Sequence, residues 1–312
     1  MSNSIINSSK SLLRYLTTGW RYSLINVGLI LLTPLVIGLV VWAEWDLFSE
    51  IIWEINVISL AIGFLILVVD MLVGALCWHS IVSKMTGFDQ IQQNIKIWLF
   101  SNLARRIPTP IWYIASRSIM YKKINVSERA TSLASGLEFV LILCAGAILS
   151  LVTLPFWPTF VGENYQTNVI WVASGLLIVS LMLMHPRVIQ KIVKLTSKEE
   201  HVLQIDWGDS IKWVAYYIIV WLIGGAVFFF VIDAFYEASV QLIMPSVSIW
   251  AIGSTISMLG SMLVFSGIIR EISIVFLLSF LIPIPIAVAV GVTLRLLWLV
   301  GELITALISL LL

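Results

Sequence analysis

The chain has 312 residues, of which 60% are hydrophobic and 11% are charged, and its formal net charge at pH 7 is +1. This composition excludes a soluble globular protein and is typical of an all-α polytopic membrane protein. We expect a single integral membrane domain over residues 1–312 and no nucleic-acid partner.

Seven apolar stretches have about the length that a helix needs to cross a hydrocarbon core of about 30 Å. They cover about residues 24–43, 57–78, 131–154, 169–184, 213–232, 247–265 and 286–312. The first stretch follows Lys10, Arg14 and Arg21, and no small-residue cleavage site comes after it. We therefore interpret it as a retained span and not as a signal peptide.

The basic residues lie on one side of this seven-span arrangement. The loop after the first span contains Glu44, Asp46, Glu50 and Glu54 and no Lys or Arg. Sixteen of the eighteen Lys and Arg residues belong to the N-terminal segment or to loops on the other side. Because basic loops stay in the cytoplasm, we predict a multi-pass protein of the cytoplasmic (inner) membrane with a cytoplasmic N-terminus. With seven spans, the C-terminus is predicted to lie outside.

Two elements interleave apolar residues with charges and prolines. In the first, the run IPTPIWYI at 107–114 contains Pro108 and Pro110. Each proline removes a backbone donor and disfavours helix in the residue before it. Irregular backbone at membrane depth survives only where protein buries it or where water reaches it. We therefore predict a re-entrant broken helix here and a second one at 267–285, whose apolar run is short and ends in two prolines.

The two broken elements give the chain a weak internal repeat. The halves cover about residues 22–155 and 213–312, and a connector span at about 169–184 joins them. In membrane transporters, repeats with broken helices in matching positions indicate a substrate site at the repeat interface. Parallel and inverted repeats are both compatible with the sequence.

Charges in and near the broken elements are the candidate site. Arg117 precedes Glu138 in the first half, and at a similar spacing Glu271 precedes Arg295 in the second, so the two charges are exchanged. An ionisable group at this depth is usually paired or faces water. We predict that Arg117 pairs with Glu138 or Glu271, that Arg295 pairs with one of the same carboxylates, and that all four converge. A structural ion pair and a substrate contact both fit this pattern.

Three further residues extend the candidate site. Arg270 adds a guanidinium of the kind that binds phosphate through two parallel hydrogen bonds. Glu302 lies two helical turns after Arg295, on the same helical face. Trp112 lies inside the first broken element. We predict that Arg117, Arg270 and Arg295, with Trp112, line a cavity that opens sideways to lipid.

Other polar and aromatic residues are interpreted as structural. Asp70, near the middle of the second predicted span, is typical of a hydrogen-bonded helix-packing residue, and a functional role is the alternative. Trp78 is one of several tryptophans near predicted span ends, which is typical of an aromatic belt, and we place His79 at the membrane interface.

No catalytic signature occurs in the sequence, which lacks a phosphate loop, an HExxH motif, a CxxC pair and a nucleophile elbow. The spacing of the acidic residues 44, 46, 50 and 54 does not match a metal site. We therefore predict that the chain is not an enzyme and needs no cofactor.

Two stretches carry a resemblance to a known family. Residues 102–138 read N-L-x-R-x-I-P-x-x-I-W-x-x-x-x-R followed by a glutamate in the next span, and the last quarter has Arg-Glu at 270–271, then an arginine and a glutamate. Together these resemble the lysylphosphatidylglycerol synthase transmembrane family, a flippase-like membrane domain that also occurs without the synthase domain. The chain has Thr109 where members often have glycine.

The resemblance implies a role in moving a lipid between leaflets, with no synthase activity. It implies a substrate site made of Pro108, Trp112, Arg117, Glu138, Arg270, Glu271, Arg295 and Glu302. We therefore predict translocation of an anionic lipid or a lipid-linked glycan. The alternative is a non-catalytic membrane subunit that anchors or regulates a partner glycosyltransferase of the cell envelope.

Overall fold

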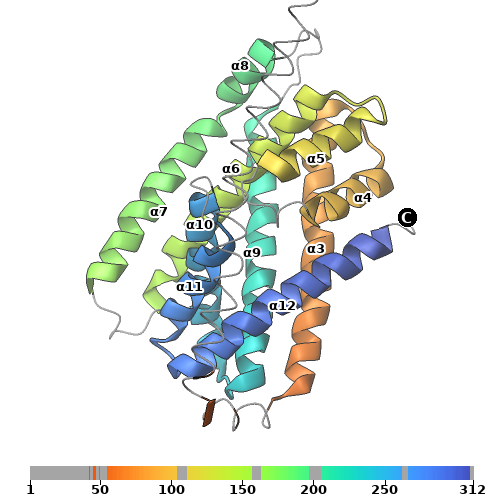
Figure 1. Cartoon of the computed structure of the whole chain (residues 1–312). Coiled ribbons are helices and arrows are strands. Elements are labelled where there is room, and N and C mark those ends of the chain that lie inside the picture. Colours follow the sequence, from red (N-terminus) through yellow and green to blue (C-terminus); the bar gives the residue numbers. More distant parts are fainter. Residues whose placement is uncertain are drawn as a thin grey trace, which may run out of the picture.

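The computed structural model describes residues 55–103, 111–156, 163–196, 205–261 and 266–309, together with positions 42, 45, 46 and 49 (Figure 1). Helices make up 89% of this part of the chain, and it contains no strand. The predicted all-α class is therefore confirmed.

Among the described residues, six helices are long and apolar enough to cross a membrane. They are α3 (Val57–Thr86), α6 (Glu128–Thr153), α7 (Glu163–Leu183), α9 (Trp207–Phe235), α10 (Ile243–Ser261) and α12 (Ile284–Ser309). Each coincides with a predicted span, whereas the first predicted span, 24–43, lies outside the described residues. The described helices are those of a multi-pass membrane protein.

Shorter helices connect the long ones. They are α4 (Ile91–Asn102), α5 (Ile111–Lys122), α8 (Pro186–Thr196) and α11 (Ser266–Leu278), with single 3-10 turns η2 (Leu154–Phe156) and η3 (Val240–Leu242). At about 1.5 Å per residue, α4 and α5 are each about 18 Å long, which is too short to cross a hydrocarbon core. They flank the predicted proline-containing break, whose residues 104–110 lie outside the described part.

Local signals at the helix ends explain where the long helices begin and end. Asn56 caps α3 by accepting hydrogen bonds from the backbone N–H groups of Ile58 and Ser59. Gly87 ends the same helix with a φ of 73°, a left-handed conformation that suits glycine. Because α3 continues to Thr86, it extends about two turns beyond Trp78.

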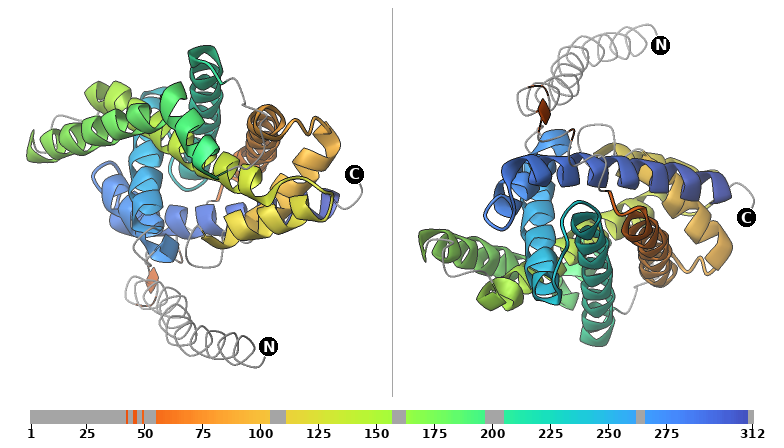
Figure 2. Two further views of the ribbon diagram at one scale, coloured as in Figure 1. Left: turned by 90° about the horizontal axis from the view of Figure 1, so that it is seen from above. Right: turned by 90° about the horizontal axis from the view of Figure 1, so that it is seen from below.

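The long helices form a bundle in which α9 packs against α3, α6, α10 and α12. Gly224 and Gly225 allow α9 to approach α10 closely, because an added Cβ would overlap Trp250 or Val247. Seen from above, α7 projects from one side of the bundle (Figure 2). Its outward surface is apolar, as expected for a helix that faces lipid.

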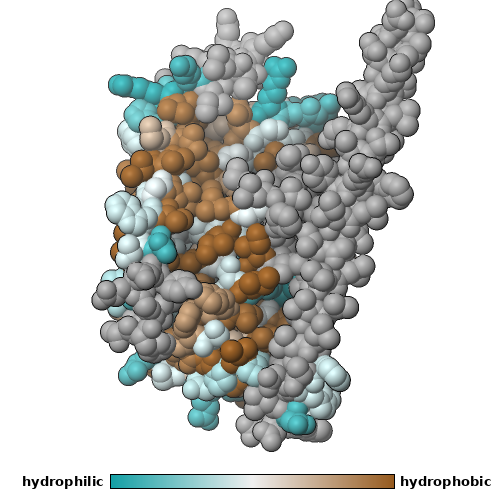
Figure 3. Space-filling view, turned by 60° about the vertical axis from the view of Figure 1, so that its left-hand side comes forward, coloured by the Kyte–Doolittle hydropathy of each residue, from teal (hydrophilic) through white to brown (hydrophobic). Residues whose placement is uncertain are grey.

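Many of the exposed charges lie at the two ends of the bundle. One end, which we call the basic end, carries Lys84, Lys122, Arg129, Arg187 and Lys212 near the ends of α3, α5, α6, α8 and α9. The opposite end, which we call the acidic end, carries Asp233 and Glu237 and the start of α3. A hydrophobic zone separates hydrophilic residues at the two ends in the space-filling view (Figure 3).

The direction of the last helix differs from the sequence prediction. The contacts of α11 with α10 are antiparallel, since Gly253 faces Ile274 and Gly260 faces Ile269. The chain thus returns toward the acidic end, where α12 begins (Figure 1). With seven spans the last one would start from the basic side, whereas α12 starts at the acidic end because α11 folds back along α10.

Candidate functional site

The predicted ion pair between Arg117 and Glu138 is confirmed. Arg117 lies on α5 and Glu138 lies on α6, and Nη1 of the arginine is 2.5 Å from Oε2 of the glutamate. Neither side chain has any exposed surface. The pair therefore lies wholly inside the protein, where each charge depends on the other for stabilisation.

Helices α4 and α9 complete the environment of the carboxylate. Oε1 of Glu138 accepts a hydrogen bond of 2.8 Å from Nε1 of Trp98 on α4 and one of 3.1 Å from the hydroxyl of Tyr217 on α9. With the arginine, donors from three helices hold the two carboxylate oxygens. These hydrogen bonds fix the relative positions of four helices.

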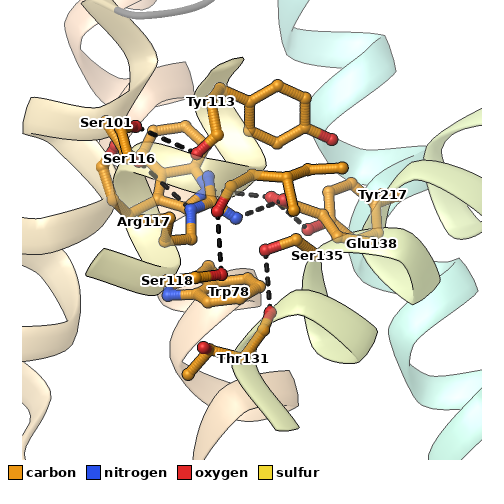
Figure 4. Close-up of polar contacts among 12 residues, drawn as sticks. Trp78, Ser101, Tyr113, Ser116, Arg117, Ser118, Thr131, Ser135, Glu138 and Tyr217 are labelled. Carbon is orange, nitrogen blue, oxygen red and sulfur yellow. Dashed lines mark hydrogen bonds and ion pairs between the residues drawn. The ribbon is translucent and has the colours of Figure 1, made fainter. Parts of the chain in front are cut away.

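The guanidinium of Arg117 is held on two further sides (Figure 4). Nε donates a 3.1 Å hydrogen bond to Oγ of Ser101, and the guanidinium carbon lies 4.0 Å from the ring centroid of Trp78 and 5.3 Å from that of Tyr113. These are cation–π distances. Nη2 of Arg117 has no hydrogen-bond partner in the described part of the chain.

A second layer of hydrogen bonds supports the platform beneath the arginine. Nε1 of Trp78 donates to the hydroxyl of Tyr121, which donates to Oδ1 of Asn94, and the amide of Asn94 contacts Nδ1 of His79. Burial raises the pKa of the Tyr121 hydroxyl, so this group stays protonated and able to donate. The layer reaches from the arginine to Asp89, which lies 3.4 Å from Nε2 of His79 near the basic end.

The positions of Glu138 along α6 and of Tyr217 along α9 show how far the ion pair lies from the basic end of the bundle. Glu138 is ten residues from the start of α6, and Tyr217 is ten residues from the start of α9. Both helices begin at the basic end, so the pair lies about 15 Å along each of them, at about 1.5 Å per residue. This places it inside the apolar part of the bundle.

A second charged cluster lies on α10, α11 and α12. Arg270 and Glu271 form an ion pair of 3.1 Å, with 22% and 12% of their side-chain surfaces exposed. The guanidinium carbon of Arg270 is 5.8 Å from the ring centroid of Trp250 and 5.9 Å from that of Trp298. These two indoles are stacked, with centroids 4.6 Å apart. Unlike Arg117, Arg270 is therefore accessible from outside the protein.

Arg295 and Glu302 lie on the same helix as Trp298, about one turn before it and one turn after it. Such spacing puts the three side chains on one face of α12. The ion pair that the structure gives Glu271 is with its neighbour Arg270, not with Arg117 as one of the predicted alternatives had it. The short spacing along the chain favours this pairing.

Arg117 with Glu138 and Arg270 with Glu271 thus form two separate clusters, and these four side chains do not converge on one. A row of aromatic residues joins the clusters: Tyr217 is one helical turn from Trp221, whose ring centroid is 6.3 Å from that of Trp250. Of the remaining predicted residues, Trp112 belongs to the first turn of α5, and Pro108 lies outside the described residues.

Several residues of the first cluster were missed in the sequence. Trp78 was assigned to an aromatic belt, but its side chain is fully buried and lies against Arg117. Trp98, Ser101 and Tyr217 carry no motif that marks them, because their proximity to Glu138 or Arg117 depends on how α4 and α9 pack. In the sequence, only the opposite charges of Arg117 and Glu138 indicated that a cluster forms here.

The geometry of the first cluster changes the interpretation of Arg117. With no exposed surface and contacts on several sides, it does not reach a headgroup in this conformation. It can act as a connection among α4, α5 and α6 that must break before the cluster opens.

Comparisons with protein-family models, with curated proteins and with solved structures found no match to this chain. The resemblance to the lysylphosphatidylglycerol synthase membrane family accordingly rests on the residues quoted above.

Proposed function

We propose that this chain translocates an anionic lipid or a lipid-linked glycan between the leaflets of the cytoplasmic membrane. In this proposal the basic end faces the cytoplasm, since Lys and Arg are retained on that side. The N-terminus is then cytoplasmic, and the acidic end faces outward. The apolar zone between the two ends supports a position of the bundle across the membrane.

In the same proposal, two broken elements enter the membrane from opposite sides. Helices α4 and α5 pack against each other near the basic end, and neither is long enough to cross. Thr255 of α10 lies beside Gly146, which is more than halfway along α6 from the basic end. Since α10 ends less than two turns after Thr255, it stops about 18 Å short of the basic end of α6. We therefore assign α10 and α11 to a re-entrant hairpin from the acidic side.

This assignment changes the expected side of the C-terminus. If α10 and α11 enter and leave on the acidic side, α12 crosses toward the basic end. Together with the predicted first span, the chain then crosses the membrane an even number of times. The C-terminus is accordingly proposed to be cytoplasmic, the opposite of the prediction made from seven spans.

The observation that carries the proposal is the state of Arg270. A guanidinium has five N–H donors, and that of Arg270 makes one hydrogen bond, to Glu271, within the described chain. It is partly exposed, lies against two indole rings and belongs to an apolar helix. A phosphate that arrives along the membrane could take two of the free donors in parallel. Arg295 and Glu302 on the facing helix extend this site in our proposal.

We assign a different role to the first cluster. The buried pair of Arg117 and Glu138 closes the interior between α5 and α6 near the basic end. A lipid headgroup cannot pass there while the pair is intact. The pair would thus act as a lock that opens during translocation, and Arg270 would make the first contact with the headgroup.

Reconstitution into vesicles with a panel of labelled lipids tests this proposal. We expect Arg270→Lys to lower transport of the preferred lipid about tenfold or more, the equivalent of about 1.4 kcal/mol, because lysine lacks the planar fork. Thermal stability should be unchanged. The matched control is Arg187→Lys, an exposed arginine of α8 at the basic end, which should transport as the parent does. Equal transport by parent and Arg270→Lys would rule out the assigned role of Arg270.

If the chain is instead a membrane subunit of a glycosyltransferase, the same preparation should give a different result. Helix α7 exposes apolar residues such as Trp171, Val172 and Met182 over most of its surface, and in the described chain it packs mainly against α6. A partner helix could cover this face. Copurification of a glycosyltransferase, with no transport by the purified chain for any lipid in the panel, would favour the membrane-subunit function.

A further inference from the structure

A buried carboxylic acid lies apart from both charged clusters. Asp70 lies near the middle of α3, a helix that spans the bundle from one end to the other. Its side chain is only 8% exposed. The carboxyl group makes no hydrogen bond or ion pair with any described residue, and its Oδ1 atom is buried without a partner. The hydrogen-bonded packing role predicted from the sequence is therefore wrong for the described part of the chain.

Neighbouring contacts place Asp70 on the interior face of α3. One turn to either side of it, Leu67 contacts Gly301 of α12, and Gly74 contacts Trp98 of α4. Gly63, two turns before Asp70, faces Phe230 of α9. Because positions 63, 67, 70 and 74 share one helical face, the carboxyl group points into the bundle and not toward lipid.

The described helices packed against α3 supply no ion-pair partner for the carboxyl group. The contact of Gly63 with α9 brings Trp221 and the two neighbouring glycines of that helix to the level of Asp70, and these carry no charge. At this level α4 contributes the indole of Trp98. Residues 142–146 of α6 lie against Trp221, and none of them is charged. The ionisable groups nearest along α12 are Arg295 and Glu302, which lie on either side of the Leu67 contact at Gly301.

The surroundings of this carboxyl group differ from those of Glu138. Arg117 balances the charge of Glu138, whereas no described residue balances Asp70.

An uncompensated carboxylate in an apolar interior is strongly unfavourable, and the neutral acid is favoured in its place. A bound metal ion could also supply positive charge, but it requires several oxygen ligands arranged around it. Among the described residues, no group of three or more metal-ligating side chains gathers at Asp70. The species that this site can bind is therefore a proton.

We propose that Asp70 is a proton-binding site inside the bundle and that it exchanges its proton during each transport cycle. When the proton binds, an O–H bond forms on the carboxylate; when the proton leaves, that bond breaks and the proton passes to water on one side of the membrane. A proton that crosses with an anionic headgroup reduces the net charge that the apolar interior must accommodate. The proton site stands on the geometry of Asp70, and its coupling to transport rests on the proposed function.

Infrared difference spectroscopy of the reconstituted protein tests the proton site without any substrate. At neutral pH the parent should show the C=O stretching band of a protonated carboxylic acid, and Asp70→Asn should lack it. Asp70→Glu should retain a shifted band. The matched control is Asp233→Asn, since Asp233 is an α9 carboxylate that accepts hydrogen bonds from Ser59 and Ala238. This control should leave the band unchanged, and a parent without a band that depends on Asp70 would overturn the proposal.

A transport assay with an imposed pH gradient tests the coupling. In the parent, we expect the transport rate to change severalfold between vesicles with and without the gradient. The transport rate of Asp70→Asn should be the same in both kinds of vesicle. If the parent transports equally well in both, the coupling is wrong and the transport function stands. If the parent transports no lipid in the panel, the proposed function fails, and the infrared result alone decides whether Asp70 binds a proton.

Discussion

Removing the arginine of the buried ion pair should destabilise the protein strongly. Arg117→Met eliminates the contact with Glu138, the hydrogen bond to Ser101 and the stacking on Trp78, and it leaves a buried carboxylate with two donors in place of three. Breaking a buried pair from one side costs about 3–5 kcal/mol. We expect a loss of about 4 kcal/mol in the free energy of unfolding, because neither partner has any exposed surface.

Titration of the purified protein with a denaturing detergent measures this free energy. The double variant Arg117→Met/Glu138→Gln completes a mutant cycle, and it should be more stable than Arg117→Met alone by about 1–3 kcal/mol, since a neutral amide needs no counter-charge. The matched control is Lys122→Met, which removes the exposed ion pair with Glu128 on the same two helices. That change should stay within about 0.5 kcal/mol.

A small loss of stability in Arg117→Met would contradict this prediction. If Arg117→Met costs less than about 1 kcal/mol, as removal of an exposed pair does, the Arg117–Glu138 contact is open to water in the dominant state. The lock assigned to this pair would then be absent.

Three further predictions address packing, the second layer and topology. Gly146→Ala should destabilise the protein by about 1–3 kcal/mol, since its Cβ would overlap side chains of α9 and α10, whereas Gly136→Ala on the same helix meets open space and should be neutral or slightly stabilising in the same titration. Tyr121→Phe removes a hydroxyl that joins an indole to an amide, and thermal unfolding should show a loss of about 1–3 kcal/mol. A reporter that is active only in the cytoplasm, fused after Leu312, should be as active as an N-terminal fusion, and an inactive C-terminal fusion would contradict the direction assigned to α12.

Hydropathy predicted the long helices well because helix length and apolar composition are local properties of the sequence. The prediction of the Arg117–Glu138 pair succeeded for a different reason, since a charge at membrane depth requires a partner and few candidates exist. In contrast, the hydrogen bonds from Trp98 and Tyr217 depend on the packing of α4 and α9 against α6. Nothing in the spacing of these residues along the chain indicates that contact.

The direction of α12 could not be read from the sequence because the turn before it carries no charge. Residues 279–283, between α11 and α12, are Ser-Phe-Leu-Ile-Pro, so the rule that keeps basic loops in the cytoplasm has nothing to act on there. Trp78 was placed in an aromatic belt for a related reason. From hydropathy, the predicted span ended at residue 78, whereas α3 continues to Thr86 and is capped by Gly87.

The stacked indoles of Trp250 and Trp298 also have an optical consequence. At 4.6 Å and an interplanar angle of 30°, the electronic transitions of the two rings couple, and the pair contributes an exciton signal to far-ultraviolet circular dichroism. The chain has fourteen tryptophans, so fluorescence averages over many environments. The exciton signal instead depends on close ring pairs such as this one, and it disappears when the rings separate. Movement of α12 relative to α10 beside Arg270 can therefore be followed in the unlabelled protein, as lipid is added.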